Sequence, residues 1–165
     1  NATLGILASG DKATYDKVLP IFEVLGANQC YLGADEQARV LKLAINTMIA
    51  STMQIEAEAV VLSEKAGLDV KQVCEVIAGS AAGSPLCGYK SAVIAEGQYP
   101  AAFSVKLLMK DLDLAFDAAK QYGVSMPATA ITRQQLAAAA ATGRADKDFS
   151  VVTQVLENAC GYERK

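Results

Sequence analysis

The chain carries a lysine and an asparagine four residues apart inside a strongly apolar stretch. Residues 40–55 read VLKLAINTMIASTMQI, and Lys42 is the only charged residue among them. In a helix, residues four apart lie about 40° apart around the axis and one turn along it. An ammonium and a carboxamide in that arrangement reach the same point, where they can hold a reacting oxygen and transfer a proton to or from it.

Two interpretations of Lys42 and Asn46 remain open from the residues alone. In the first, the apolar stretch removes Lys42 from bulk water, which suits a lysine to general acid or base catalysis. In the second, Lys42 extends its four-carbon stem to a wet surface and Asn46 has no special task. Helical periodicity by itself favours the second interpretation.

The composition is typical of an ordered globular chain. Its 165 residues are 52% hydrophobic and 20% charged, with a net charge of −3. Because no Lys/Arg cluster occurs, we expect neither a nucleic acid nor an anionic membrane as a partner, and no apolar run is long enough for a membrane span. The four cysteines lack CxxC spacing and histidine is absent, so we predict no metal site, buried free thiols and a cytoplasmic location.

The first 33 residues predict one β-α-β unit. Residues 3–8 form an apolar run, a turn follows at residues 9–11, and residues 13–25 show helical periodicity that ends at Gly26. Residues 29–32 are strand-like and stop at Gly33. One such unit cannot form a stable sheet alone, so we expect the last piece of a larger sheet.

After Gly33 the pattern predicts helices only, and hence a mainly α fold. A long helix over residues 35–66 carries Lys42 and Asn46, and Asp69 with Gln72 indicates a capped start for the next helix. Further helices are expected near residues 86–96, 105–122, 127–142 and 149–159, separated by Gly97, Gly123 and Gly143.

Several short segments follow one another in a characteristic order. They are Gly33, Lys42, Asn46, AEAVVLSEKAGLD at 57–69, GSAAGS at 79–84, Phe103, MKDLDLA at 109–115 and KDFS at 147–150. In this order the chain resembles the β-hydroxyacid dehydrogenases, a family that includes 3-hydroxyisobutyrate dehydrogenase, tartronate semialdehyde reductase and, more distantly, 6-phosphogluconate dehydrogenase. The resemblance implies that residues 1–33 end a dinucleotide-binding Rossmann domain. It also implies that residues 34–165 form a substrate-binding and dimerisation domain, a helical bundle like the C-terminal domain of 6-phosphogluconate dehydrogenase.

The resemblance assigns chemistry to the pair on the long helix. Lys42 matches the family's catalytic lysine, and Asn46 matches the asparagine one turn later that orients the substrate. Hydride transfer between an alcohol carbon and a nicotinamide leaves an oxygen that must lose or gain a proton. An amine beside that oxygen can do either, so the resemblance implies that Lys42 is the general acid or base.

Four further residues are candidates for binding. Lys110 matches a lysine that contacts the cofactor, NAD or NADP, and Phe103 matches an aromatic residue near the nicotinamide. Their structural alternatives are a solvated lysine at a helix start and an ordinary core aromatic. Gly83 and Ser84 are candidates for substrate contact, although a tight turn that requires glycine is the favoured explanation for their loop.

The chain departs from the family pattern in two ways. Where the family has a glycine-rich start to the long helix, G-x-x-G-x-G-x-x-x-K, this chain has Glu36 and Ala38 at the second and third glycine positions. This departure predicts either a reshaped substrate pocket or an ordinary first turn of the helix. No G-x-G-x-x-G follows a strand. The chain opens on Asn1 rather than methionine, so we expect a truncated protein that is inactive alone.

Two classes of function therefore stand. The first is part of an NAD(P)-dependent oxidoreductase that acts on a β-hydroxyacid or its semialdehyde and forms a homodimer. The second is a helical dimerisation module that keeps the fold without catalysis. A relative of the imine reductases is less attractive, because those proteins generally have another residue in place of Lys42.

Overall fold

The structure is a computed structural model and describes residues 4–164. These residues form two compact units, and the division falls between Ile45 and Asn46, inside the longest helix. The predicted domain boundary lies earlier, between residues 33 and 34. The assignment of the two parts as domains with different tasks stays a prediction.

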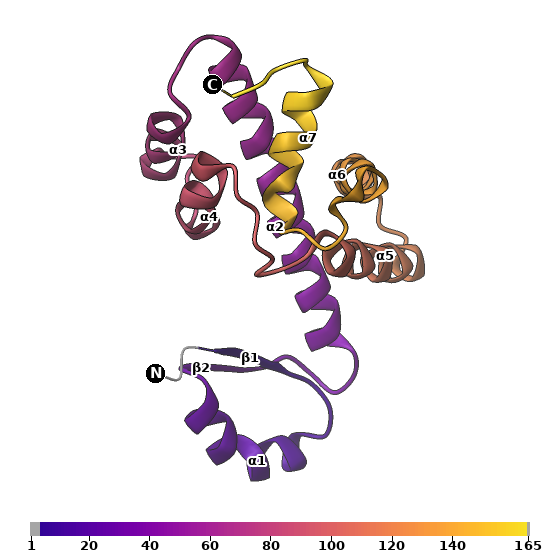
Figure 1. Cartoon of the computed structure of the whole chain (residues 1–165). Coiled ribbons are helices and arrows are strands. Elements are labelled where there is room, and N and C mark those ends of the chain that lie inside the picture. Colours follow the sequence, from indigo (N-terminus) through magenta and orange to yellow (C-terminus); the bar gives the residue numbers. More distant parts are fainter. Residues whose placement is uncertain (1–3, 165) are drawn as a thin grey trace. The chain divides into compact units, whose positions relative to one another are not determined.

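The first unit contains two parallel strands joined by a helix (Figure 1). Strand β1 (Gly5–Ala8) pairs with β2 (Asn28–Tyr31) in the register Gly5 to Asn28, and helix α1 (Lys12–Leu25) connects them. The Asp11 side chain caps α1 by accepting a hydrogen bond from the Thr14 N–H at 2.7 Å. The predicted β-α-β unit is therefore present, with Thr3 outside the described residues.

Helix α2 (Gln37–Lys65) is 29 residues long and begins in the first unit. The predicted helix over residues 35–66 is thus confirmed to within two residues at its start and one at its end. It carries both Lys42 and Asn46.

The second unit is helical, and its helix boundaries follow the predicted glycine signals. After α2 come α3 (Val70–Gly79), α4 (Pro85–Glu96), α5 (Val105–Tyr122), α6 (Pro127–Ala139) and α7 (Val152–Ala159). Gly97 and Gly123 end α4 and α5 with φ values of 64° and 67°, the left-handed conformation that glycine adopts most readily. The predicted start of α3 is also present, because the Asp69 side chain accepts from the Gln72 N–H at 2.9 Å.

Two predicted helices have modified ends. The helix expected over 127–142 stops as an α-helix at Ala139 and continues as a π-helical turn, Ala140–Arg144, with Gly143 at a φ of 83°. The helix expected over 149–159 starts with a 3-10 turn, Phe149–Val151, before α7.

One hydrophobic core holds the helical unit together. In Figure 1, α3 lies beside α4, and α5 lies beside α6, in agreement with their contacts. The largest apolar side chains that are fully buried in the core are Met53, Val60, Ile94, Val105, Leu108, Leu112, Leu136 and Val151. Among the described helices, none combines the length and the apolar character that a membrane span requires.

Candidate functional site

Lys42 and Asn46 differ sharply in their surroundings. The Lys42 side chain is exposed, whereas Asn46 is 2% exposed. Of the two interpretations of Lys42, its exposure agrees with the second, in which the side chain reaches a wet surface. The residue as a whole is therefore in contact with solvent.

A hydrogen-bond chain connects two of the predicted site residues through a third that sequence reasoning missed. The Asn46 Nδ2 donates to Oδ2 of Asp111 at 2.7 Å, and the Lys110 Nζ donates to Oδ1 of the same carboxylate at 2.5 Å. Asp111 follows Lys110 in the segment MKDL. An acidic residue inside the segment predicted to contact the cofactor was the feature of the sequence that could have pointed to Asp111. Asp111 fixes the Asn46 carboxamide while Lys110 stays largely in solvent, with its side chain 60% exposed.

Phe103 packs against the core. Its ring meets the Phe149 ring edge-on with centroids 5.9 Å apart, and it is half-buried. The Phe103 N–H donates to Oδ2 of Asp148 at 3.2 Å, and its carbonyl oxygen accepts from the Phe149 N–H at 3.0 Å. These contacts agree with the core interpretation of Phe103, and its role near the nicotinamide stays a prediction.

Gly83 and Ser84 have structural tasks at the start of α4. A Cβ atom at Gly83 would lie 2.3 Å from the Ala78 carbonyl oxygen, a distance that only glycine avoids. The Ser84 Oγ caps α4 by accepting from the Cys87 N–H at 3.2 Å. Both observations favour the tight-turn explanation of this loop.

A buried ion pair, Lys90 with Asp148, was missed by sequence reasoning. The Lys90 Nζ lies 2.9 and 2.8 Å from the two Asp148 carboxylate oxygens, and the residues are 2% and 0% exposed. Desolvation raises the Asp148 pKa, but the hydrogen bonds from Lys90 and Ser150 outweigh it and hold the pKa below its ordinary value. The spacing of the buried residues Cys87, Lys90 and Ile94 on one face of α4 was the signal that Lys90 points inward.

A second buried cluster joins the end of the chain to α2 and α7. The Arg164 guanidinium lies 2.8 Å from Glu64 and 2.6 Å from Glu157, so one cation faces two buried carboxylates. Burial raises the pKa of Glu157 to about 7, although Arg164 opposes this shift. Glu157 therefore takes up a proton near neutral pH.

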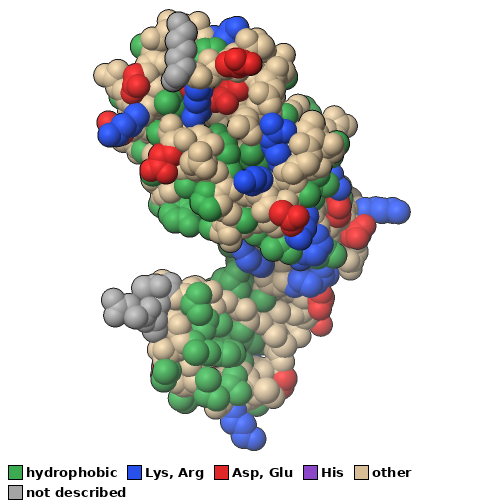
Figure 2. All heavy atoms as spheres, viewed as in Figure 1, with side chains coloured by type: hydrophobic (Ala, Val, Ile, Leu, Met, Phe, Trp, Pro, Cys, Tyr) green, Lys and Arg blue, Asp and Glu red, His purple; other side chains and the backbone are tan. Residues whose placement is uncertain are grey.

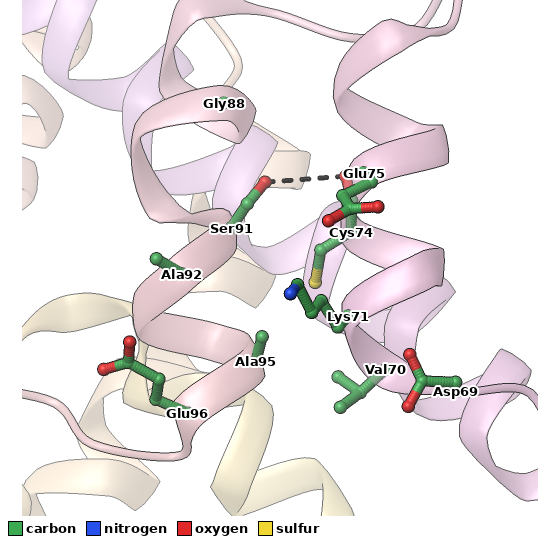
Figure 3. A pocket seen from close by; sticks show the side chains of 10 residues that line it. All are labelled: Asp69, Val70, Lys71, Cys74, Glu75, Gly88, Ser91, Ala92, Ala95 and Glu96. Carbon is green, nitrogen blue, oxygen red and sulfur yellow. Dashed lines mark hydrogen bonds between the residues drawn. The ribbon is translucent and has the colours of Figure 1, made fainter.

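A groove of about 490 Å³ runs between α3 and α4 (Figure 3). Ala92 and Ala95 of α4 line it together with Val70 and Cys74 of α3, and the Ser91 Oγ donates to the Cys74 carbonyl oxygen at 3.5 Å. The groove contains none of the six predicted site residues.

The four cysteines are free thiols, as predicted, but the expectation that all are buried is wrong. Cys74 and Cys87 are buried, whereas Cys30 and Cys160 are exposed. Burial raises the pKa of the Cys74 thiol to about 11, which keeps it protonated and unreactive.

Comparison with known proteins identifies the family. The profile of a family described as the NAD-binding domain of NADP-dependent 3-hydroxyisobutyrate dehydrogenase matches residues 37–156. The chain belongs to this family. The family resemblance inferred from the ordered segments is thereby confirmed, and so is the prediction that the family's cofactor is NAD or NADP.

Several relatives of this 3-hydroxyisobutyrate dehydrogenase-like chain are named as reductases or dehydrogenases. Glyoxylate/succinic semialdehyde reductase 2 of Arabidopsis thaliana is 33% identical over 95% of this chain and 44% of its own length. The 2-hydroxy-3-oxopropionate reductase of Escherichia coli is 30% identical over 94% of this chain and 53% of its own. This chain thus spans about half the length of the curated relatives it matches.

A solved structure supports the same fold. The 3-hydroxyisobutyrate dehydrogenase of Mycobacterium tuberculosis, solved with L-serine, superposes with a TM-score of 0.83 at 30% identity. The match covers 94% of this chain and 55% of that protein. The mainly helical character of this family member, with a small two-stranded sheet, was predicted correctly.

Proposed function

We propose that this chain is part of an NAD(P)-dependent oxidoreductase that interconverts a β-hydroxyacid and its semialdehyde, with Lys42 as the general acid or base. The observation that carries the proposal is family membership together with the position of Lys42. This lysine is an exposed residue one helical turn before Asn46, whose carboxamide is held by Asp111. The relatives, named for glyoxylate, succinic semialdehyde and 2-hydroxy-3-oxopropionate, indicate a small oxo-acid substrate.

Residues of this chain would transfer the proton and orient the substrate. In the reducing direction the Lys42 ammonium donates a proton to the substrate oxygen as the carbonyl becomes an alcohol. In the oxidising direction the neutral amine accepts that proton. The Asn46 carboxamide orients the substrate, and Glu36 and Ala38 at the start of the long helix shape the pocket that selects it.

The nicotinamide cofactor supplies or accepts the hydride when it is bound. Lys110 fits an anionic dinucleotide, because its ammonium is largely in solvent and available to a phosphate. Its partner Asp111 would compete with the phosphate for the same ammonium. We therefore expect Lys110 to supply only part of the affinity for the dinucleotide. The exposed part of Phe103 would offer an apolar contact near the nicotinamide, and Gly83 and Ser84 would form a rigid wall for the substrate.

We infer the division into two domains that the family resemblance implies. Residues 1–33 would end a Rossmann domain, and residues 34–165 would form the helical substrate-binding and dimerisation domain. The parallel β1–β2 pair, and the exposed apolar residues Leu4, Ile21, Val24 and Leu25 around it, support this inference, because they offer a surface that a larger sheet domain would cover. Figure 2 shows hydrophobic side chains gathered on that unit.

The test uses the full-length protein and a panel of small β-hydroxyacids and semialdehydes with NAD and NADP in both redox states. Turnover is followed by nicotinamide absorbance. Lys42→Ala should lower turnover by about 10²–10⁴-fold, the range for loss of a general acid or base, with the circular dichroism spectrum unchanged. Lys106→Ala removes another exposed lysine and should leave turnover intact.

The outcomes separate the two candidate functions. Near-normal turnover in Lys42→Ala would contradict the role of the lysine. Inactivity of the wild type across the whole panel would favour the second candidate, a helical association module without catalysis. That candidate draws support from the exposed apolar residues of α2, Met48, Ile55 and Leu62 among them. The 165-residue chain assayed beside the full-length protein tests our expectation that it is inactive alone.

A further inference from the structure

The segment that follows α7 turns back onto the helical unit. Gly161 has a φ of 60°, and the Tyr162 N–H donates to the Glu157 carbonyl oxygen at 2.9 Å, so the chain reverses its direction after the helix. Figure 1 shows this segment crossing back toward the end of α2. We call residues 161–164 the strap, because they tie the ends of α2, α4 and α7 together through Arg164.

The Arg164 guanidinium uses all three of its nitrogens at this junction. Nε lies 2.8 Å from Oε1 of Glu64 on α2, and Nη2 lies 2.6 Å from Oε1 of Glu157 on α7. Nη1 donates to the carbonyl oxygen of Ile94 on α4. An acceptor beside each nitrogen suits a planar, delocalised guanidinium better than an ammonium, whose charge is concentrated on one atom. The junction therefore has the geometry of a guanidinium site.

Arg164 does not use all the hydrogen-bonding capacity of this site. Oε2 of Glu64 and the Tyr99 hydroxyl are buried and have no hydrogen-bond partner among the described residues, and these two residues are 3% and 5% exposed. The Nε and Nη2 contacts of Arg164 are close ion pairs without hydrogen bonds. Buried polar atoms normally have partners. Such unused capacity beside a tethered guanidinium indicates a site that a cation free to turn would fill better.

The strap lines two hollows that adjoin these buried groups. The first, of about 520 Å³, is lined in part by Glu64, and the second, of about 430 Å³, is lined in part by Tyr99 and Glu157. The side chains of residues 162–164 belong to the walls of both hollows. Each hollow has the volume of a small-molecule site. A small ligand that displaces Arg164 therefore has room beside the two buried carboxylates.

The charge of the two hollows favours a cation. Among the described residues that line them, Arg164 carries the single positive charge. Five carboxylates belong to the same linings, and they are Glu64, Asp69, Glu96, Glu157 and Glu163. A cavity lined by one sign of charge attracts small ions of the opposite sign. The ligand class that fits both the charge and the three acceptors is a small guanidinium compound.

We propose that the junction of α2, α4 and α7 is a binding site for small guanidinium compounds, and that Arg164 occupies it as a tethered ligand of the same chemistry. A free compound competes with Arg164 for Glu64 and Glu157, and its binding releases the strap. The tether raises the effective concentration of Arg164, so a free compound binds the wild type weakly and binds better once that side chain is removed. The inference goes beyond the proposed oxidoreductase function and is independent of the chemistry of Lys42.

The test is chemical rescue of Arg164→Ala in the full-length protein. The melting temperature is measured against the concentration of ethylguanidinium chloride, with ethylammonium chloride and sodium chloride compared at equal ionic strength. For ethylguanidinium we expect a saturable rise of at least about 2 °C. Its apparent Kd should be at least about 10-fold lower for Arg164→Ala than for the wild type. Arg133→Ala is the matched control, since it removes a guanidinium paired with the exposed Asp113, and it should show no saturable rise.

Several outcomes would overturn the proposal. They are the lack of a saturable rise in Arg164→Ala, an equal rise in Arg133→Ala, and equal rescue by ethylammonium. If Arg164→Ala does not fold, Arg164→Lys keeps a cation beside the carboxylates and undergoes the same titration, in which a Kd no lower than that of the wild type overturns the proposal.

A second variant tests the assignment of the acceptors. Glu157→Gln added to Arg164→Ala removes one of the two carboxylates that would hold the free compound. It should raise the Kd for ethylguanidinium by at least about 5-fold, because a neutral acceptor replaces a charged one. An unchanged Kd would show that the compound binds elsewhere and would overturn the proposal.

Discussion

Lys42 and Lys90 show how differently one residue type is used in two regions of the molecule. Lys42 lies exposed on α2 in an apolar stretch of sequence, and Lys90 lies 2% exposed on α4 with both oxygens of Asp148 within 2.9 Å. Sequence reasoning considers desolvation for Lys42 alone, whereas the structure buries Lys90. The buried lysine holds a buried carboxylate, whereas Lys42 lies at the surface.

We expect Lys90 to matter for the stability of the fold and Lys42 for catalysis. Asp148 also accepts hydrogen bonds from the Phe103 N–H and the Ser150 Oγ, so Lys90 neutralises a carboxylate that organises three segments. Loss of Lys90 would leave that carboxylate buried without a cation. Loss of Lys42 removes an exposed side chain, which is inexpensive for folding.

The largest expected effect on folding comes from breaking the buried pair. Lys90→Met should lower the free energy of unfolding by about 3–5 kcal/mol, the range for an uncompensated buried charge, as measured by urea denaturation. The control Lys106→Met removes an exposed lysine paired with Asp146 and should cost less than about 1 kcal/mol.

A double variant refines this comparison. Lys90→Met with Asp148→Asn removes both charges and keeps a side-chain acceptor for the surrounding N–H groups. It should recover much of the stability lost in Lys90→Met alone. If Lys90→Met lowers the free energy of unfolding by less than about 1 kcal/mol, the Lys90–Asp148 pair does not stabilise the fold as we propose.

The cluster of Glu64, Glu157 and Arg164 differs from both lysines. Two buried carboxylates there share one guanidinium, so the negative charges outnumber the positive one. The Glu157 pKa is raised to about 7, so the folded state holds a proton that the unfolded state releases near its ordinary value of 4.5. This contribution to stability is fully present below about pH 4.5 and is lost as the pH rises through about 7. It amounts to at most about 3 kcal/mol.

The variant Glu157→Gln tests that pH dependence. Thermal unfolding of the wild type should lose stability between pH 5 and pH 8 relative to Glu157→Gln, which lacks the titrating group. Parallel pH profiles of the two proteins would contradict the assignment of a buried, protonated Glu157.

The smallest expected effect concerns the two partners of Asp111. Asn46→Ala leaves a partly buried carboxylate oxygen without its donor and should cost about 1–2 kcal/mol in urea denaturation. Lys110→Ala removes the exposed partner of the other oxygen and should change stability by less than about 1 kcal/mol. Equal losses would mean that burial does not distinguish the two contacts.

Local signals explain why the fold could be predicted well. Gly97 and Gly123 end helices at the predicted positions, and Asp69 caps α3 as expected, because caps and left-handed turns depend on a few neighbouring residues. The ends of α6 and α7 deviated, since a π-helical turn and a 3-10 turn leave no distinct pattern in the sequence.

Long-range pairing explains why the surroundings of the site could not be predicted. Lys90 meets a partner 58 positions later in the chain, and Asn46 meets Asp111 at a separation of 65. Helical periodicity tells which face of a helix a residue occupies but not which side of the helix the core will cover. That limit also left two interpretations of Lys42 open, because α2 carries exposed apolar residues as well as buried ones.

The most direct test of the account compares Lys42→Ala and Lys90→Met in the full-length protein. Turnover is measured per folded molecule, with the folded fraction taken from denaturation curves of the same samples. We expect Lys42→Ala to keep the stability of the wild type and to lose turnover. Lys90→Met should lose stability and keep its turnover per folded molecule. The reverse pattern, or normal turnover in Lys42→Ala, would contradict the account.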